Sequence, residues 1–152
     1  MKNIKINIQI IYSVNNIFPK KSDFFKWIKN ICLKKKLKKI EINIKIVNSK
    51  EMSYLNMKFC KKNYPTNILS FSVDDIHKKN SYFIGDLIIC KEIIELEAIK
   101  YKKKIKEHWA HIVIHGTLHL LNYNHNNKKK AIKMEYMENK FLKKLGYSNP
   151  YL

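Results

Sequence analysis

Hydrophobic and polar residues alternate along two stretches of the chain, a spacing typical of β-strands that bury one face. Isoleucines occupy every second position in Ile4–Ile10, and the same alternation returns in Ile40–Ile46. Apolar and β-branched residues predict two further strands, over Ile68–Val73 and Tyr82–Cys90, joined by the polar stretch Asp74–Ser81. The pattern therefore predicts about four strands.

Apolar residues recur at helical spacing in five other segments, with lysines on the opposite faces. The predicted helices cover Lys20–Lys36, Ser49 to about Lys62, Glu92–Lys102, Ile105–Leu121 and Lys128–Leu145. We expect Ser49 to cap the second helix, Phe59 to point inward from it, and Gly146 to end the last. This order, without repeat or linker, predicts an α+β fold. We expect a small mixed sheet packed against helices, in a single domain over residues 1–152.

The predicted helix Ile105–Leu121 carries its polar residues on one narrow face. At 100° per residue, four histidines fall within a sector of about 80°: His108, His111, His115 and His119. The other sides of this helix are almost entirely apolar, and such a helix is buried. The sequence thus predicts a central buried helix whose only polar face is a stripe of histidines.

The spacing of three histidines predicts a metal site. His115 and His119 are one helical turn apart, so both imidazoles can reach one ion. Asn122 can adopt the left-handed conformation that closes a helix, and the chain can then turn back to present His125. Three neutral imidazoles with one open position are a catalytic zinc arrangement. We therefore predict a metal-dependent hydrolase with one zinc ion per chain, held by His115, His119 and His125.

Other residues near this predicted site have less defined roles. His108 and His111 are expected to contact the ligands or the substrate, because three ligands already suffice. Gly116 stands where H-E-x-x-H peptidases carry their glutamate base, so a peptidase is disfavoured. Asp86 is a candidate for a wall of the site or, equally, for a hydrogen bond to the backbone near Gly85. The proton-transfer residue is not identified.

Composition and charge also indicate the kind of binding partner and the cellular location. The net charge is +19, and every basic residue is lysine. Such a field favours a polyanionic partner, although part of it is consistent with a compositional bias over the whole chain. The absence of arginine argues against specific recognition of bases, because lysine lacks the planar fork of donors that arginine offers. Cysteines are few and scattered, and no apolar run has the length of a signal peptide or membrane span. We expect a cytoplasmic protein that does not enter a membrane.

The histidine motif and three further blocks resemble one known family. HIVIHGTLHLLNYNH at His111–His125 is similar to the H-G-x-L-H-L-x-G-Y-D-H signature of the YbeY family of bacterial rRNA maturation factors. The family's three zinc-binding histidines fall on His115, His119 and His125. PTNILSF at Pro65–Phe71, GDLIIC at Gly85–Cys90 and LGY at Leu145–Tyr147 match its other conserved blocks. The close resemblance covers roughly residues 50–151.

The resemblance implies a zinc-dependent endoribonuclease that prefers single-stranded RNA. It implies a role in rRNA maturation, including the 3′ end of small-subunit rRNA, and in ribosome quality control, with the small ribosomal subunit as a partner. The alternative is a non-catalytic or weakly catalytic, zinc-bound ribosome assembly factor that binds rRNA. Cleavage of single-stranded RNA with and without a chelator separates the two.

Three departures from the family pattern bear on activity. Asn122 replaces a glycine, and asparagine tolerates the left-handed turn. Asn124 replaces an aspartate, which removes a carboxylate beside the third predicted ligand. Cys60 stands where the family usually carries an arginine, and a thiol cannot clamp a phosphate through two parallel hydrogen bonds. Lys61 or Lys62 could supply charge there, but without the planar fork.

Overall fold

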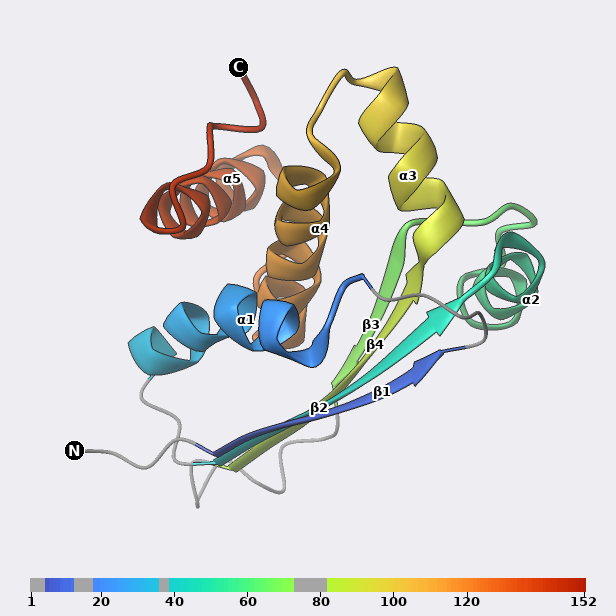
Figure 1. Cartoon of the computed structure of the whole chain (residues 1–152), viewed down its shortest axis with the longest axis horizontal. Coiled ribbons are helices and arrows are strands. Elements are labelled where there is room, and N and C mark those ends of the chain that lie inside the picture. Colours follow the sequence, from blue (N-terminus) through green and yellow to red (C-terminus); the bar gives the residue numbers. More distant parts are fainter. Residues whose placement is uncertain (1–4, 13–17, 36–38, 73–81) are drawn as a thin grey trace.

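The computed structural model describes residues 5–12, 18–35, 39–72 and 82–152. Within these residues four strands form one mixed sheet in the order β1-β2-β4-β3 (Figure 1). The strands are β1 (Lys5–Tyr12), β2 (Lys39–Val47), β3 (Ile68–Ser72) and β4 (Tyr82–Cys90). β1, β2 and β4 run parallel, and β3 pairs antiparallel to β4. The predicted α+β class with a small mixed sheet is confirmed. Ile4, Lys36 and the stretch Val73–Ser81 lie outside the described residues.

The alternation of isoleucines places one face of β2 in the core. Ile40, Ile42, Ile44 and Ile46 are each 1% exposed, whereas the residues between them remain partly accessible. They belong to the larger hydrophobic cluster, which also includes residues of α1, α4 and α5. Figure 1 shows these helices on one side of the sheet, with α4 between α5 and α3. The period of two in the sequence therefore orients the sheet toward the central helix.

The described residues also form five helices, close to the predicted segments. They are α1 (Lys21–Lys35), α2 (Ser49–Cys60), α3 (Lys91–Lys100), α4 (Ile105–Leu120) and α5 (Lys128–Lys144). Gly146 follows α5 with φ of 83°, as expected for a residue that ends a helix. No helix among the described residues is both long and apolar enough to cross a bilayer.

Two predictions about α2 are wrong. Asn48 caps the helix, because its side-chain oxygen accepts from the Glu51 backbone amide at 2.8 Å. Ser49 instead donates its hydroxyl to Glu92 at 2.7 Å. Phe59 is 52% exposed, since it lies in the last turn of α2 and its ring packs against only one described aromatic, Phe71. Sequence spacing identified the helix but not how far the sheet covers it.

Helix α4 is packed on several sides, as its apolar surface predicted. It contacts α1, α3 and α5 as well as β3 and β4. Gly116 allows the closest approach: a Cβ there would overlap Ile68 Cδ1 and lie 3.2 Å from the Ser70 hydroxyl oxygen. That hydroxyl donates to the Gly116 carbonyl at 3.0 Å. Glycine therefore lets β3 lie directly against α4, beside His115.

Candidate metal centre

Three histidines converge at the end of α4. His115 and His119 come from the helix and His125 from the loop after it, and one ring nitrogen of each lies within 4.8 Å of the others. The ring centroids of His115 and His119 are 4.7 Å apart, and those of His119 and His125 are 5.1 Å apart. Among the described residues this is the one group of three or more metal-ligating side chains. It contains the three residues that the sequence predicts as ligands.

The loop after α4 turns the chain back so that His125 faces the helix. Asn122 has φ of 70°, the left-handed conformation expected from the sequence. The Asn122 amide donates to the His119 carbonyl at 3.0 Å, and the Tyr123 amide to the Leu118 carbonyl at 3.0 Å. Asn124 accepts from the Asn126 amide at 3.1 Å through its side-chain oxygen. An asparagine at position 124 therefore still provides the acceptor that holds this loop.

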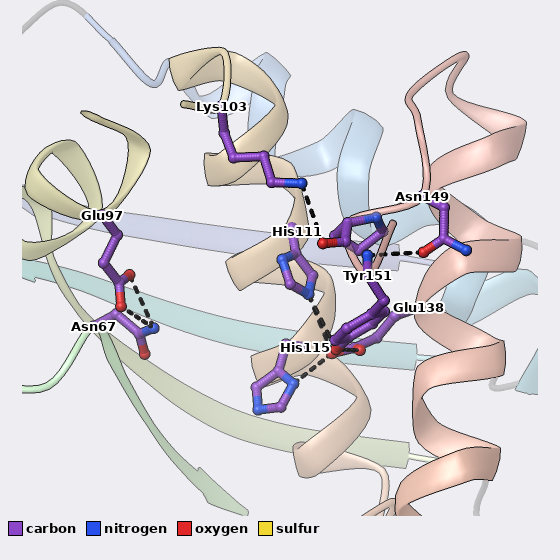
Figure 2. A network of polar contacts seen from close by, with 9 residues as sticks. Asn67, Glu97, Lys103, His111, His115, Glu138, Asn149 and Tyr151 are labelled. Atoms are coloured by element: carbon purple, nitrogen blue, oxygen red, sulfur yellow. Dashed lines mark hydrogen bonds and ion pairs between the residues drawn. The ribbon is translucent and has the colours of Figure 1, made fainter. Parts of the chain in front are cut away.

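Glu138 fixes the orientation of His115, and sequence reasoning missed it. This residue of α5 is fully buried, and its carboxylate accepts a short hydrogen bond from His115 Nδ1. A second short hydrogen bond comes from the Tyr151 hydroxyl, and His111 Nε2 lies 3.6 Å away (Figure 2). Burial alone would raise the pKa of Glu138, but the nearby His111 imidazole and hydrogen bonds from His115 and Tyr151 hold this pKa at about 2. The ionised carboxylate keeps the proton on Nδ1 and leaves Nε2 of His115 free to bind a metal.

The charge state of His119 also suits metal binding. Burial, reinforced by repulsion from His115 and His125, lowers the pKa of His119 to about 4. The imidazole is therefore neutral at pH 7 and offers a lone pair. Metal binding requires neutral histidine, so no proton has to be displaced from this side chain.

The other two histidines of the stripe point along the same face of α4 but lie outside the cluster. His108 is 7% exposed, and its Nε2 is 3.1 Å from Glu97 Oε1. His111 Nε2 is 3.4 Å from the Tyr151 hydroxyl. Burial would raise the pKa of Glu97, but hydrogen bonds from His108 and Asn67 lower it overall. The stripe therefore contains a potential metal site at one end and histidine–carboxylate contacts along the rest.

A cleft of about 410 Å³ opens beside the three histidines. Its walls include Cys60, Lys62, Tyr64 and Ser70. The position at which the resemblance places an arginine is thus in the wall of this cleft, where the chain has an exposed thiol. Lys62 places a positive charge in the same wall, without the fork of a guanidinium.

Asp86, one candidate for a wall of the site, does not line this cleft. Its carboxylate accepts from the side-chain amide of Asn43 at 3.0 Å, a partner different from the backbone near Gly85 that was the alternative interpretation. The reason is the register of the sheet, which pairs Asn43 of β2 directly with Asp86 of β4. The polar partner that a strand aspartate needs is therefore supplied by the neighbouring strand.

Comparisons with known proteins agree with this geometry. The family model described as Endoribonuclease YbeY matches residues 9–146. A protein of that name from Buchnera aphidicola subsp. Acyrthosiphon pisum is 51% identical over 152 residues, covering 100% of this chain and 97% of the relative. Another, from Wigglesworthia glossinidia brevipalpis, is 50% identical and covers 96% of each chain. The solution structure of TM1509 from Thermotoga maritima has the same fold, with a TM-score of 0.59, 24% identity and coverage of 91% and 88%.

Proposed function

Since the chain belongs to the YbeY family of endoribonucleases, we propose that it is a zinc-dependent enzyme that cleaves single-stranded RNA in rRNA maturation and ribosome quality control. Membership makes it a hydrolase that acts on RNA. The proposal adds zinc as the metal, rRNA and the small ribosomal subunit as partners, and the cytoplasm as the location. The observation that carries it is the convergence of His115, His119 and His125 in a cleft that also contains a lysine.

The donor set fits zinc. Three imidazole nitrogens from a helix and the following loop leave one side of the cluster facing the cleft. Zinc held there would polarise a phosphoryl oxygen and lower the pKa of a water to about 7. Glu138 orients His115 toward that position through Nδ1, and the low pKa of His119 keeps its imidazole neutral. We assign His115, His119 and His125 as the ligands of a single ion.

The walls of the cleft suit a phosphodiester chain. Lys62 can attract the phosphate backbone and stabilise negative charge beside the three histidines. Lys58, in the last turn of α2, and Lys61, at its C-terminal cap, are exposed two residues before and one residue after Cys60. These lysines extend the positive charge along the edge of the cleft, as expected for contacts with successive phosphates.

Exposed aromatic side chains at the same edge favour single strands. Tyr64 lines the cleft and is 55% exposed, and Phe59 is exposed one residue before Cys60. Lys58 Nζ lies 5.4 Å from the centre of the Phe59 ring. Unpaired bases can stack on such rings while the lysines contact the backbone. Bases in a duplex are already stacked and paired, so they cannot use these surfaces without unwinding.

The alternative, a zinc-bound assembly factor that binds rRNA without cutting it, is favoured by one observation. Cys60 lies in the wall of the cleft and cannot supply the charge that an arginine would. Incubation of the purified protein with a single-stranded RNA and with its duplex, with zinc or with a chelator, separates the proposals. Cleavage that needs zinc and is faster on the single strand supports the nuclease. Tight binding without cleavage in the presence of zinc would leave only the assembly factor.

A further inference from the structure

A second cavity, of about 540 Å³, lies next to the metal centre along the same face of α4. Three histidines of the stripe, His108, His111 and His115, form its floor, while α3 and the C-terminal segment form its sides. Figure 2 shows Asn67 and Glu97 on one side of α4 and Tyr151 on the other, with His111 and His115 between them. Asn67 and His115 line both this cavity and the cleft of the metal centre. The two hollows are therefore contiguous.

The second cavity differs from the metal cleft in its charge. Glu97 and Glu107 line it. Lys103 also lines it, but its ammonium group donates to the Pro150 carbonyl at 3.1 Å. Carboxylates repel a phosphate, whereas the metal cleft with its lysine attracts one. The net charge of the chain is +19, so carboxylates in this cavity reverse the sign of the charge locally. Such a cavity is suited to bind an uncharged part of a nucleotide that carries hydrogen-bond donors.

Glu97 is held so that its carboxylate can act as a selective acceptor. Oε1 accepts from His108 Nε2 at 3.1 Å and from the Asn67 side-chain amide at 3.2 Å, and Oε2 lies 3.4 Å from the same amide. A carboxylate offers about four acceptor positions, so these contacts fix it without saturating it. A quarter of the Glu97 side chain stays exposed. Tyr101 and Tyr151, each about half exposed, add aromatic surface to the same cavity.

We propose that this cavity is a nucleobase subsite, which takes the base beside the scissile phosphate while Glu97 accepts a hydrogen bond from its exocyclic amino group. The inference rests on the proposed function, because it needs an RNA strand in the metal cleft. A carboxylate is a suitable partner for the cytosine amino group and has no hydrogen to donate to the uracil carbonyl at the same ring position. The subsite thus gives base selectivity to a chain whose phosphate contacts come only from lysine.

The test compares octacytidylate with octauridylate, both with phosphorothioate linkages that slow cleavage, for binding to the zinc-loaded protein. We expect octacytidylate to bind about tenfold more tightly, the discrimination typical of one specific base contact. Glu97→Gln should bring this ratio close to one. Glu95→Gln is the matched control, because Glu95 lies on the same helix but outside the cavity, paired with Lys91. It should keep the ratio of the unmodified chain.

If the unmodified chain bound the two oligonucleotides with equal affinity, the subsite would be overturned, whatever the variants showed. A ratio that persists in a folded Glu97→Gln protein would overturn the role of Glu97. Unmodified octanucleotides separate these failures from that of the proposed function. If they are cleaved with zinc but without preference for cytidine, the subsite fails and the nuclease stands. If cytidine is preferred in binding but neither oligonucleotide is cleaved, the nuclease proposal fails and the subsite stands.

Discussion

Replacing Cys60 with arginine should accelerate RNA cleavage. Residue 60 is the last residue of α2, and it is exposed in the wall of the cleft that contains His115, His119 and His125. An arginine side chain would extend into that cleft and could contact a phosphate through two parallel hydrogen bonds. A hydrogen bond to a charged group contributes about 1.5–3 kcal/mol. Because water competes at this exposed position, we expect the lower end, which corresponds to about a tenfold rise in kcat/KM.

The assay is steady-state cleavage of a fluorescent single-stranded RNA by zinc-loaded protein. Cys60→Lys adds the charge without the fork and should give a smaller gain. Lys50→Arg places a guanidinium in the exposed first turn of the same helix, outside the lining of the cleft, and should leave kcat/KM unchanged. The reasoning would be refuted if Cys60→Arg were no faster than Cys60→Ser, since both replace the thiol and only one adds the clamp.

Three further predictions concern the metal site, the packing of α4 and the positive charge of the chain. Glu138→Gln should weaken zinc binding by about ten- to a hundredfold, because it alters the carboxylate that orients His115. Competition with a chelator measures the zinc affinity. Glu135→Gln, which changes an exposed residue of the same helix, should bind zinc as tightly as the unmodified chain. Gly116→Ala should lower the free energy of unfolding by about 1–3 kcal/mol, because its Cβ overlaps Ile68 Cδ1. Urea denaturation should show that Ile68→Val, which removes that atom, recovers part of the loss in the double variant; strictly additive effects would contradict the steric cause. RNA affinity should fall steeply with salt, and neutralising Lys128–Lys130 should reduce the slope if that run lies on the RNA path. A flat salt dependence in the unmodified chain would rule out the electrostatic account.

The elements that position the site were predictable because each leaves a short-range pattern. The alternation through Ile40–Ile46 predicted the buried face of β2, and the apolar surface of the helix around the histidines predicted its burial. The spacing of His115, His119 and His125 placed two side chains one turn apart and the third beyond a left-handed residue. Asn122 adopts that conformation, and the three rings meet.

The contacts between distant elements were not predictable in the same way. Glu138 lies 23 residues after His115, and the pairing depends on how α5 packs against α4. A signal was present, because Glu138 falls among Met134, Met137 and Phe141 on the buried face of α5, where a lone carboxylate needs partners. Its partner could not be identified from periodicity. Asp86 shows the same difficulty, because only the sheet register pairs it with Asn43.

The most direct test of the central claim is the zinc-to-protein ratio of purified single-histidine variants. We predict one zinc ion per chain for the unmodified protein and for His111→Ala, whose side chain lies outside the cluster. His115→Ala, His119→Ala and His125→Ala should each lose the ion, because each removes one of three ligands. Full zinc content in His125→Ala together with loss in His111→Ala would contradict the assignment of the metal centre.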